Sequence, residues 1–336
     1  MCGIVGIFKS DGNDVSADIY DGLIQVQHRG QDASGICTWN NSKMFMHKEL
    51  GLVSEVFKKE NLLKLNGNIG IGHVRYPTAG CDDVIESQPF YSANPISISL
   101  AHNGTLINSD KVKSKLIKTH FCQFNTDSDS EVLLNLFAYE LSKIQFRKIS
   151  KSHVFAALER VYETISGGFA VVMIVAGVGI VAFRDKHGIR PLVLGEKNND
   201  YMFASESSAL SALGYEFMQD VKPGQAVIIG ENGKLTKKQI AKKTNHSPCL
   251  FEYVYFSRPD STIDSISVHK SRLRMGDYLG ERINIEYPSL KIDVVIPIPD
   301  TSRTSAMQVA HKVGAKYREG FMTVSYTHLT LPTKNE

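Results

Sequence analysis

A cysteine at the second position of this 336-residue chain could act as a nucleophile. Once the initiator methionine is removed, Cys2 carries both a thiol and a free α-amine. An α-amine has an ordinary pKa of about 7.7 to 8.0, so it can accept the thiol proton and later return it to a leaving group. A lone cysteine is a weak signal, and an early cysteine without a function is the competing interpretation.

Attack of a thiolate on an amide creates an oxyanion, which neutral hydrogen-bond donors in a dry site stabilise. The segment AHNG offers two such donors, the side-chain amide of Asn103 and the backbone N–H of Gly104. A hairpin turn is the alternative interpretation, because Asn-Gly is a strong turn signal. The two interpretations are compatible.

Recognition of a free amino acid requires partners for its carboxylate and its ammonium. Arg75 can bind a carboxylate with two parallel N–H groups, and Asp129 can bind an ammonium. The competing interpretations are a surface ion pair for Arg75 and a helix N-cap for Asp129. Asp129 could serve in both roles.

The elements that must position these residues form a mixed pattern. A short apolar run after Cys2 predicts a strand. Helical spacing follows at 18–26, 129–141 and 153–165, and two apolar runs at 169–176 and 179–184 predict a pair of strands. The absence of regular βαβ alternation favours layered mixed sheets over a doubly wound sheet.

The pattern changes after a polar stretch, 231–248, that resembles a linker. Beyond it we expect a helix at 271–285, a strand at 292–299, a helix from about Ala306 and a strand that ends near Phe321. This order predicts one βαβ unit of a parallel sheet.

Charge and composition exclude several classes of protein. The net charge is +3, from 38 basic and 35 acidic residues, which is too balanced for a typical nucleic-acid binder. The longest apolar run, 169–183, is too short to span a membrane, and the N-terminus lacks a secretory signal. Five cysteines without a CxxC pair indicate neither a disulfide framework nor a zinc site. We therefore expect a cytoplasmic protein with no nucleic-acid or membrane partner.

Five segments, MCGIVGIF, QHRGQDASG, GHVRYPTAG, AHNG and TDSDSE, resemble in this order the signature of class II glutamine amidotransferases. The resemblance implies an α+β fold, the four-layer αββα sandwich of the N-terminal nucleophile hydrolases, over residues 2–230. It also implies glutamine as the substrate. The implied catalytic residues are Cys2, Asn103 and Gly104, and the implied glutamine-binding residues are Arg29, Gly30, Arg75, Tyr76, Thr78 and Asp129.

Six segments, HRGQDA, YPTAG, GIRPLVLG, FASESSAL, CLFEYVYFSRPDS and DVVIPIPDTS, are similar to the amidophosphoribosyltransferase family of glycosyltransferases. The resemblance implies that Cys2 hydrolyses glutamine to glutamate and ammonia. In an intact enzyme the ammonia would convert 5-phosphoribosyl diphosphate to 5-phosphoribosylamine for purine synthesis, with purine nucleotides as feedback inhibitors of a homo-oligomer. The alternatives are a class II amidotransferase with another acceptor and a catalytically silent regulatory or binding fragment.

Residues 249–323 resemble the start of an α/β type I phosphoribosyltransferase domain. The segment DTSRTS after the predicted strand resembles a diphosphate-binding loop, and Thr301 matches a position near Mg2+ in intact members of the family. A strand followed by a Ser- and Thr-rich helix N-cap is common, which is the alternative interpretation. The implied diphosphate-loop residues are Asp300, Thr301, Ser302, Thr304 and Ser305.

The chain departs from the family in its last part. The acidic strand end and phosphate loop of a phosphoribosyltransferase are missing, and residues 324–336 match no part of the family. We therefore expect a truncated second domain, a tail that is not native, and at most the glutaminase half of the activity. Cys249 matches one possible ligand of a [4Fe-4S] cluster, but Cys37, Cys81 and Cys122 match none of the others, so no cluster is expected.

Overall fold

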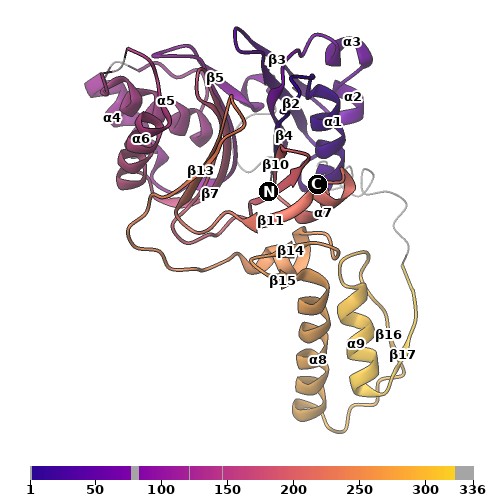
Figure 1. Cartoon of the computed structure of the whole chain (residues 1–336). Coiled ribbons are helices and arrows are strands. Elements are labelled where there is room, and N and C mark those ends of the chain that lie inside the picture. The colour runs from indigo at the N-terminus through magenta and orange to yellow at the C-terminus, as the bar shows by residue number, and fades with distance from the viewer. Residues whose placement is uncertain (1, 77–82, 121, 146, 322–336) are drawn as a thin grey trace. The chain divides into compact units, whose positions relative to one another are not determined.

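The computed structural model describes residues 2–76, 83–120, 122–145 and 147–321. Contacts between residues divide the chain into two compact units, Met1–Pro248 and Cys249–Glu336. Figure 1 shows the elements of each unit.

The first unit is built on two antiparallel sheets (Figure 1). The first sheet has the strand order β11-β9-β10-β1-β4-β2-β3, and the second has the order β13-β12-β8-β7-β6-β5. The strands of the first sheet are β1 (Gly3–Phe8), β2 (Ala33–Trp39), β3 (Met44–Leu50), β4 (Ile69–Arg75), β9 (Val193–Lys197), β10 (Asp200–Ala204) and β11 (Glu216–Asp220). Those of the second are β5 (Phe90–Ser92), β6 (Ile98–Leu106), β7 (Gly167–Val175), β8 (Gly179–Arg184), β12 (Gln225–Gly230) and β13 (Leu235–Gln239).

The central strands are apolar on both faces because both faces are covered. Every residue of β1 is buried, and successive side chains of a strand point to opposite faces. Ile4 and Phe8 pack in the core between the two sheets, where Val172 of β7 joins them. Val5 and Ile7 pack in a separate core under the helices of the first sheet. Cys2 thus precedes a strand that is fixed from both sides.

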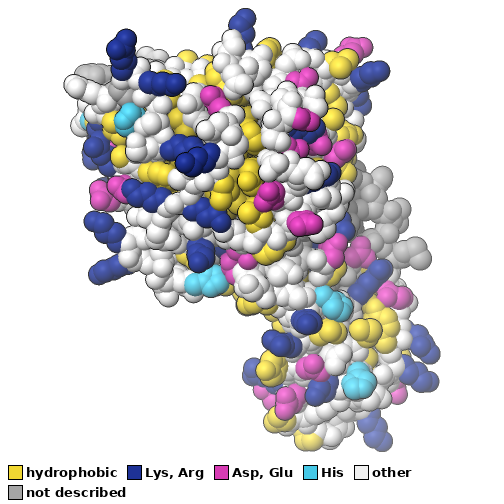
Figure 2. All heavy atoms as spheres, viewed as in Figure 1, with side chains coloured by type: hydrophobic (Ala, Val, Ile, Leu, Met, Phe, Trp, Pro, Cys, Tyr) yellow, Lys and Arg dark blue, Asp and Glu magenta, His cyan; other side chains and the backbone are white. Residues whose placement is uncertain are grey.

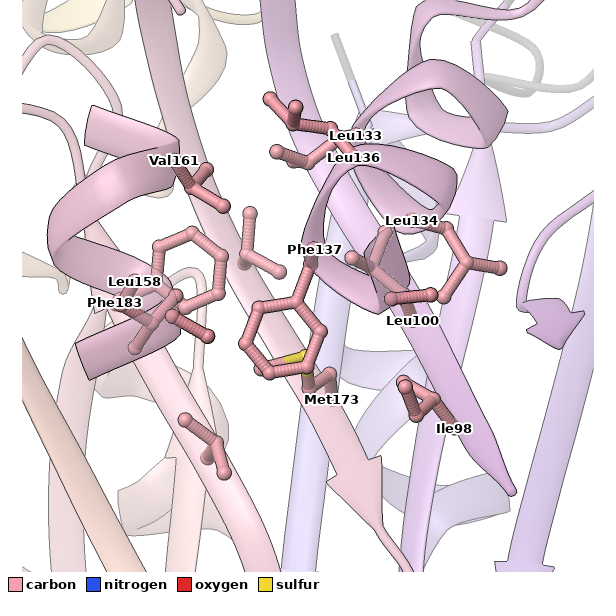
Figure 3. Close-up of a cluster of buried hydrophobic side chains, with 14 of the residues drawn as sticks. Ile98, Leu100, Leu133, Leu134, Leu136, Phe137, Leu158, Val161, Met173 and Phe183 are labelled. Atoms are coloured by element: carbon pink, nitrogen blue, oxygen red, sulfur yellow. The ribbon is translucent and has the colours of Figure 1, made fainter. Parts of the chain in front are cut away.

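Helices cover the outer face of each sheet. Those on the first sheet are α1 (Ser16–Gln25), α2 (Val53–Val56), α3 (Lys59–Leu62) and α7 (Ser207–Ala212). Those on the second sheet are α4 (Ser109–His120), α5 (Asp129–Ser142) and α6 (Lys151–Thr164). In Figure 3, Phe137 of α5 lies among Leu158 of α6 and Met173 of β7. The four layers confirm the predicted αββα sandwich.

The connections comprise two short helical turns in the first unit, η1 (Gln27–Arg29) and η2 (Val84–Glu86). The predicted helices at 129–141 and 153–165 are confirmed as α5 and α6, and the predicted strand pair as β7 and β8. The start of the predicted linker was wrong, because Leu235–Gln239 forms β13 and pairs with β12. This strand lies at the sheet edge and carries exposed lysines, so its composition resembles that of a linker.

The second unit contains a π-helical turn, η3 (Glu252–Phe256), and a small hairpin of β14 (Thr262–Ile263) and β15 (Ile266–Ser267). It continues with α8 (Val268–Glu286), β16 (Val294–Val295), α9 (Arg303–Val313) and β17 (Lys316–Tyr317). The parallel pairing of β16 with β17 confirms the predicted βαβ unit, although the strand expected at 292–299 has only two paired residues.

Helices α8 and α9 pack closely because α8 carries glycines at their contact. A Cβ atom added to Gly276 would lie 2.4 Å from the carbonyl oxygen of Ser305, and one added to Gly280 would lie 2.6 Å from Cβ of Lys312. Larger residues at these positions would therefore push α9 away from α8.

Basic and acidic side chains both occur on each unit on the face shown in Figure 2, in keeping with the small net charge. Within the described ranges, the structure contains no helix with the length and apolar character that crossing a membrane requires.

Candidate active site

The pairing of β1 with β4 brings Cys2 to the end of β4. Gly3 pairs with Val74, so Cys2 lies beside the two residues that follow Val74 in the chain. The Cys2 Sγ approaches the carbonyl oxygen of Tyr76 at 3.9 Å. Tyr76 itself is half exposed, at 49%. Thr78, the next predicted glutamine-binding residue, lies outside the described residues.

Burial and several neighbouring groups shift the pKa of the Cys2 thiol. Burial has the largest influence and raises its pKa, because a thiolate is poorly solvated there. The main chain of Tyr76 and the guanidinium of Arg75 act in the opposite direction, whereas Asp129 also raises the pKa. A thiol in this environment requires a base before it can attack.

Arg75 ends β4 in the interior of the first unit. It is 6% exposed, which rules out the surface ion pair that was the alternative interpretation. Its carbonyl oxygen accepts a hydrogen bond from the backbone N–H of Asp32, at 3.1 Å. A Cβ atom on Gly30 would lie 2.5 Å from the carbonyl carbon of Arg75, so only glycine lets these two segments approach each other.

Arg29 contacts the main chain of the predicted nucleophile. Its Nε donates a hydrogen bond to the carbonyl oxygen of Cys2, at 3.2 Å. Its Nη1 donates to Oε1 of Glu206 at 2.5 Å, and His28 Nε2 lies 2.8 Å from the same oxygen. Glu206 is not among the site residues predicted from the sequence. Its only signal there was an acidic residue within the segment FASESSAL.

Asn103 and Gly104 lie inside β6, paired with β7, and not at a hairpin turn. Strand β6 packs against β1 and β4 from the facing sheet. Asn103 is 1% exposed, and its Nδ2 has no hydrogen-bond partner among the described residues. Such a buried donor requires an explanation, and a ligand oxygen would supply one.

Gly104 could not be replaced by a larger residue without a shift of the backbone. Its φ is +155°, a conformation that other residues rarely adopt. An added Cβ atom would lie 2.1 Å from the carbonyl oxygen of Gly168 on β7. The register of β6 and β7 at this point therefore depends on glycine.

Asp129 begins α5, but Ser128 is the N-cap of the helix, so the predicted capping role of Asp129 was wrong. The Ser128 side chain accepts a hydrogen bond from the backbone N–H of Ser130, at 3.3 Å. Asp129 Oδ2 instead accepts one from the backbone N–H of Leu106, at 2.8 Å, at the end of β6. This bond ties the predicted ammonium ligand to the strand that carries Asn103.

Two buried histidines occupy the strands of the site. His102 Nδ1 lies 2.9 Å from Ser130 Oγ and 3.7 Å from Asp129 Oδ1, and burial lowers the pKa of its ring. Burial also lowers the pKa of His73, on β4, to about 3, with the charge of His102 acting in the same direction. Both rings are therefore neutral near pH 7.

The predicted diphosphate loop lies in the second unit, between β16 and α9. Ser302 is the N-cap residue of α9, and its Oγ donates to the carbonyl oxygen of Ile298. Asp300 Oδ1 lies 3.2 Å from Nη2 of Arg303. Thr304 and Ser305 lie within the helix and not in the loop.

The described part of the chain contains no group of three or more His, Cys, Asp or Glu residues that could hold a metal ion. Thr301, the predicted residue near Mg2+, has the carboxylate of Asp300 beside it in the chain, and that carboxylate is in an ion pair with Arg303. Mg2+ requires near-octahedral oxygen ligands, which this set of donors does not supply by itself.

Comparisons with known proteins identify the family of the chain. A model of the glutamine amidotransferase domain matches residues 73–212. The chain is 49% identical over 336 residues to the amidophosphoribosyltransferase of Escherichia coli K12, covering 98% of this chain and 66% of the relative. It is 44% identical over 346 residues to that of Saccharomyces cerevisiae, covering 100% and 68%.

A solved structure also resembles the chain over its whole length. The glutamine phosphoribosylpyrophosphate amidotransferase of Bacillus subtilis, complexed with ADP and GMP, has a TM-score of 0.82 and 31% sequence identity, covering 100% of this chain and 70% of that one. The chain thus spans about two thirds of the length of these relatives. It belongs to the amidophosphoribosyltransferase family.

Proposed function

We propose that the first unit hydrolyses glutamine to glutamate and ammonia, with Cys2 as the nucleophile. The observation that carries the proposal is the side-chain amide of Asn103, a buried donor without a hydrogen-bond partner among the described residues. It lies on a strand that packs against the strand beginning after Cys2. An unpaired buried donor is costly unless a bound group accepts its hydrogen bond, so it fits an oxyanion site.

The reaction would begin after removal of Met1, when the α-amine of Cys2 becomes the base. The amine takes the thiol proton, and the thiolate attacks the side-chain amide carbon of glutamine. The carbonyl oxygen becomes an oxyanion, which accepts hydrogen bonds from Asn103 Nδ2 and the N–H of Gly104. Return of the proton to the amide nitrogen expels ammonia and leaves a γ-glutamyl thioester on Cys2. Attack of water on the thioester then releases glutamate and restores the thiol.

Binding of the amino-acid end of glutamine would use Arg75 and Asp129. The guanidinium of Arg75 suits the α-carboxylate because it can donate two parallel hydrogen bonds. Asp129 has one oxygen bonded to the N–H of Leu106, and its other oxygen can face an ammonium. Tyr76 and Thr78 follow Arg75 in the chain, and we propose that Thr78 assists Arg75 at the carboxylate and that Tyr76 covers the bound substrate.

For the whole protein we propose transfer of the ammonia to 5-phosphoribosyl diphosphate, giving 5-phosphoribosylamine and diphosphate in purine synthesis. The names of the relatives support this proposal. The described loop at Asp300 would contribute only part of a diphosphate site. Mg2+, when bound, would neutralise the diphosphate and take oxygen ligands mainly from it. ADP and GMP in the Bacillus subtilis structure support purine nucleotides as ligands, and we also propose a cytoplasmic homo-oligomer.

The glutaminase proposal is tested by replacing Cys2 with serine. We expect Cys2→Ser to lower kcat for glutamate release by more than about 10,000-fold, as loss of a nucleophile does in other hydrolases. Ammonia and glutamate would both be measured, because the proposed reaction releases them in equal amounts. Mass spectrometry of the N-terminal peptide would verify that Met1 has been removed from both proteins. Equal rates in the wild type and the variant would refute the proposal.

A matched control is Cys37→Ser, because Cys37 is a buried cysteine on β2 in the core between the sheets. Burial raises the pKa of its thiol to about 12, so it is a poor nucleophile at neutral pH. We expect this variant to lose stability but to keep its turnover per folded molecule.

A further inference from the structure

Hydrogen bonds from two distant segments hold the main chain on both sides of Gly3. Ser205, which follows β10, donates its N–H to the carbonyl oxygen of Ile4, and its Oγ accepts from the N–H of Ile4, both at 3.0 Å. Arg29 Nε donates to the carbonyl oxygen of Cys2, at 3.2 Å. These contacts leave the thiol and the α-amine of Cys2 available for chemistry.

The bond to the Cys2 carbonyl is needed because Cys2 precedes β1. Terminal residues move unless a specific contact holds them, and the paired residues of β1 begin at Gly3. A misplacement of about 1 Å at a reacting group can lower a rate about 100-fold. The orientation of Arg29 thus bears on the position of the nucleophile.

Glu206 fixes the orientation of Arg29. The side chains of both residues are fully buried, and Arg29 Nη1 lies 2.5 Å from Glu206 Oε1. A guanidinium with one nitrogen held by a carboxylate can present another to a carbonyl in a defined direction. The pairing of Val5 with Ala204 explains the location of Glu206, because continuing this register brings residue 206 level with Gly3.

Burial of this ion pair is not explained by stability alone. Removing two charges from water is costly, and a buried pair often stabilises a protein no more than apolar residues of similar size would. A buried pair in contact with the main chain of the nucleophile therefore points to a role in geometry.

We propose that Glu206 is a positioning residue for the nucleophile. It holds Arg29 in the orientation that anchors the carbonyl of Cys2, and it thereby sets the direction of the thiol and the α-amine. This inference rests on the proposed glutaminase function. It assigns Glu206 no contact with glutamine.

The test compares Glu206→Gln, Arg29→Lys and the double variant with the wild type, all as the full chain. The number of competent sites would be counted by labelling with iodoacetamide and quantifying the modified Cys2 peptide. We expect each single variant to lower kcat per labelled Cys2 about 100-fold, with KM changed by less than about threefold. The double variant should be no slower than the slower single variant, because both changes disrupt the same hydrogen bond to the Cys2 carbonyl.

Glu140→Gln is the matched control. Glu140 is also a buried carboxylate of the first unit, paired with Lys143 at 2.7 Å, but it lies on α5 near the end opposite to Asp129. Its removal should leave kcat per labelled Cys2 unchanged. If Glu206 has a purely structural role, Glu206→Gln should resemble this control. It would lower the number of labelled sites and leave kcat per labelled Cys2 unchanged.

The inference would be overturned if kcat per labelled Cys2 in Glu206→Gln stays within about twofold of the wild-type value. It would also be overturned if the losses of the two single variants multiply in the double variant. If Glu206→Gln does not fold, Arg29→Lys tests the inference instead. This variant keeps a positive charge opposite the buried carboxylate of Glu206. An unchanged kcat in Arg29→Lys then overturns the inference, and a lower kcat at constant KM supports it. A wild type that hydrolyses no glutamine would refute the proposed function as well, so the two failures are distinguishable.

Discussion

The surroundings of Cys2 and the loop at Asp300 differ in how their residues are assembled. Around Cys2, the contacting residues Arg29 and Tyr76, and Glu206 bound to Arg29, come from segments far apart in the sequence, and sheet pairing brings them together. The residues of the loop are nearly consecutive, and they lie between one strand and one helix.

The two regions also differ in what their polar groups bind. In the first unit, the amide of Asn103 is buried and has no hydrogen-bond partner in the described part of the structure. In the second unit, the hydroxyls of Ser302 and Ser305 bind backbone carbonyl oxygens, and Asp300 pairs with Arg303. The unpartnered amide of Asn103 is therefore a stronger indication of a binding site than the run of polar residues in the loop at Asp300.

The largest effect that sharpens this comparison is expected for Asn103→Ala. Loss of one oxyanion donor should lower kcat for glutamine hydrolysis by about 100- to 1000-fold, with little change in KM. Steady-state kinetics of glutamate release would measure both constants. The control is Asn108→Ala, because Asn108 Nδ2 is already bonded to the carbonyl oxygen of Thr164. Similar losses of kcat in the two variants would show that the unpaired amide has no special role.

Arg75→Lys should act mainly on binding. A lysine cannot donate two parallel hydrogen bonds to a carboxylate, and loss of a charged hydrogen bond costs about 1.5 to 3 kcal/mol. We therefore expect KM for glutamine to rise about 10- to 150-fold, with a smaller change in kcat. Rates over a wide range of glutamine concentration would separate the two constants. A large fall in kcat at constant KM would show that Arg75 and Asn103 have exchanged roles.

The stability of the two units should also respond differently to acid. His73 is buried in the first unit, whereas His269 and His311 are exposed in the second. The folded pKa of His73, about 3, lies below its ordinary value of 6.5. Between these values the unfolded chain binds more protons, so His73 makes the first unit less stable as pH falls from 6.5 towards 3. The free energy of unfolding should fall by about 1.4 kcal/mol per pH unit from this group.

Urea denaturation at several pH values would measure this slope, with His73→Gln as the test and His269→Gln as the control. The slope should become smaller in His73→Gln and stay unchanged in His269→Gln. An unchanged slope in both variants would contradict the assignment of the acid response to His73.

The smallest effect is expected for Ser305→Ala in the second unit. Ser305 Oγ donates to the carbonyl oxygen of Arg272 on α8, at 2.9 Å, so its loss should lower the stability of the second unit by about 1 kcal/mol. Thermal unfolding would measure this change, and glutamine hydrolysis should not change. A loss of glutamine hydrolysis in this variant would contradict the expectation that the two regions act independently.

Much of the first unit could be predicted from the sequence because its signals are local. The segments around Arg75 and Asn103 carry motifs, and the helical spacing at 129–141 fixes α5. Glu206 could not be predicted in this way. Its role depends on the antiparallel register of β10 with β1, which joins residues about 200 positions apart along the chain.

Two errors in the sequence analysis have a common physical cause. The edge strand β13 resembled a linker because exposed lysines conceal its pairing with β12. Asp129 resembled an N-cap because Asp and Ser are both favoured there, and only the structure shows that Ser128 has this role. In both cases the local composition allowed two structures, and the hydrogen bonds of the folded chain decided between them.

The most direct test of the proposed site is to trap the intermediate on Cys2. The wild-type chain would be mixed with glutamine, quenched in acid within one turnover and digested, and mass spectrometry would locate any γ-glutamyl thioester. We predict an adduct on a peptide that begins at Cys2, with its α-amine free and Met1 absent. Glutamine hydrolysis without this adduct, or with the adduct on Cys37, Cys122 or Cys249 instead, would contradict the assignment of Cys2 as the nucleophile.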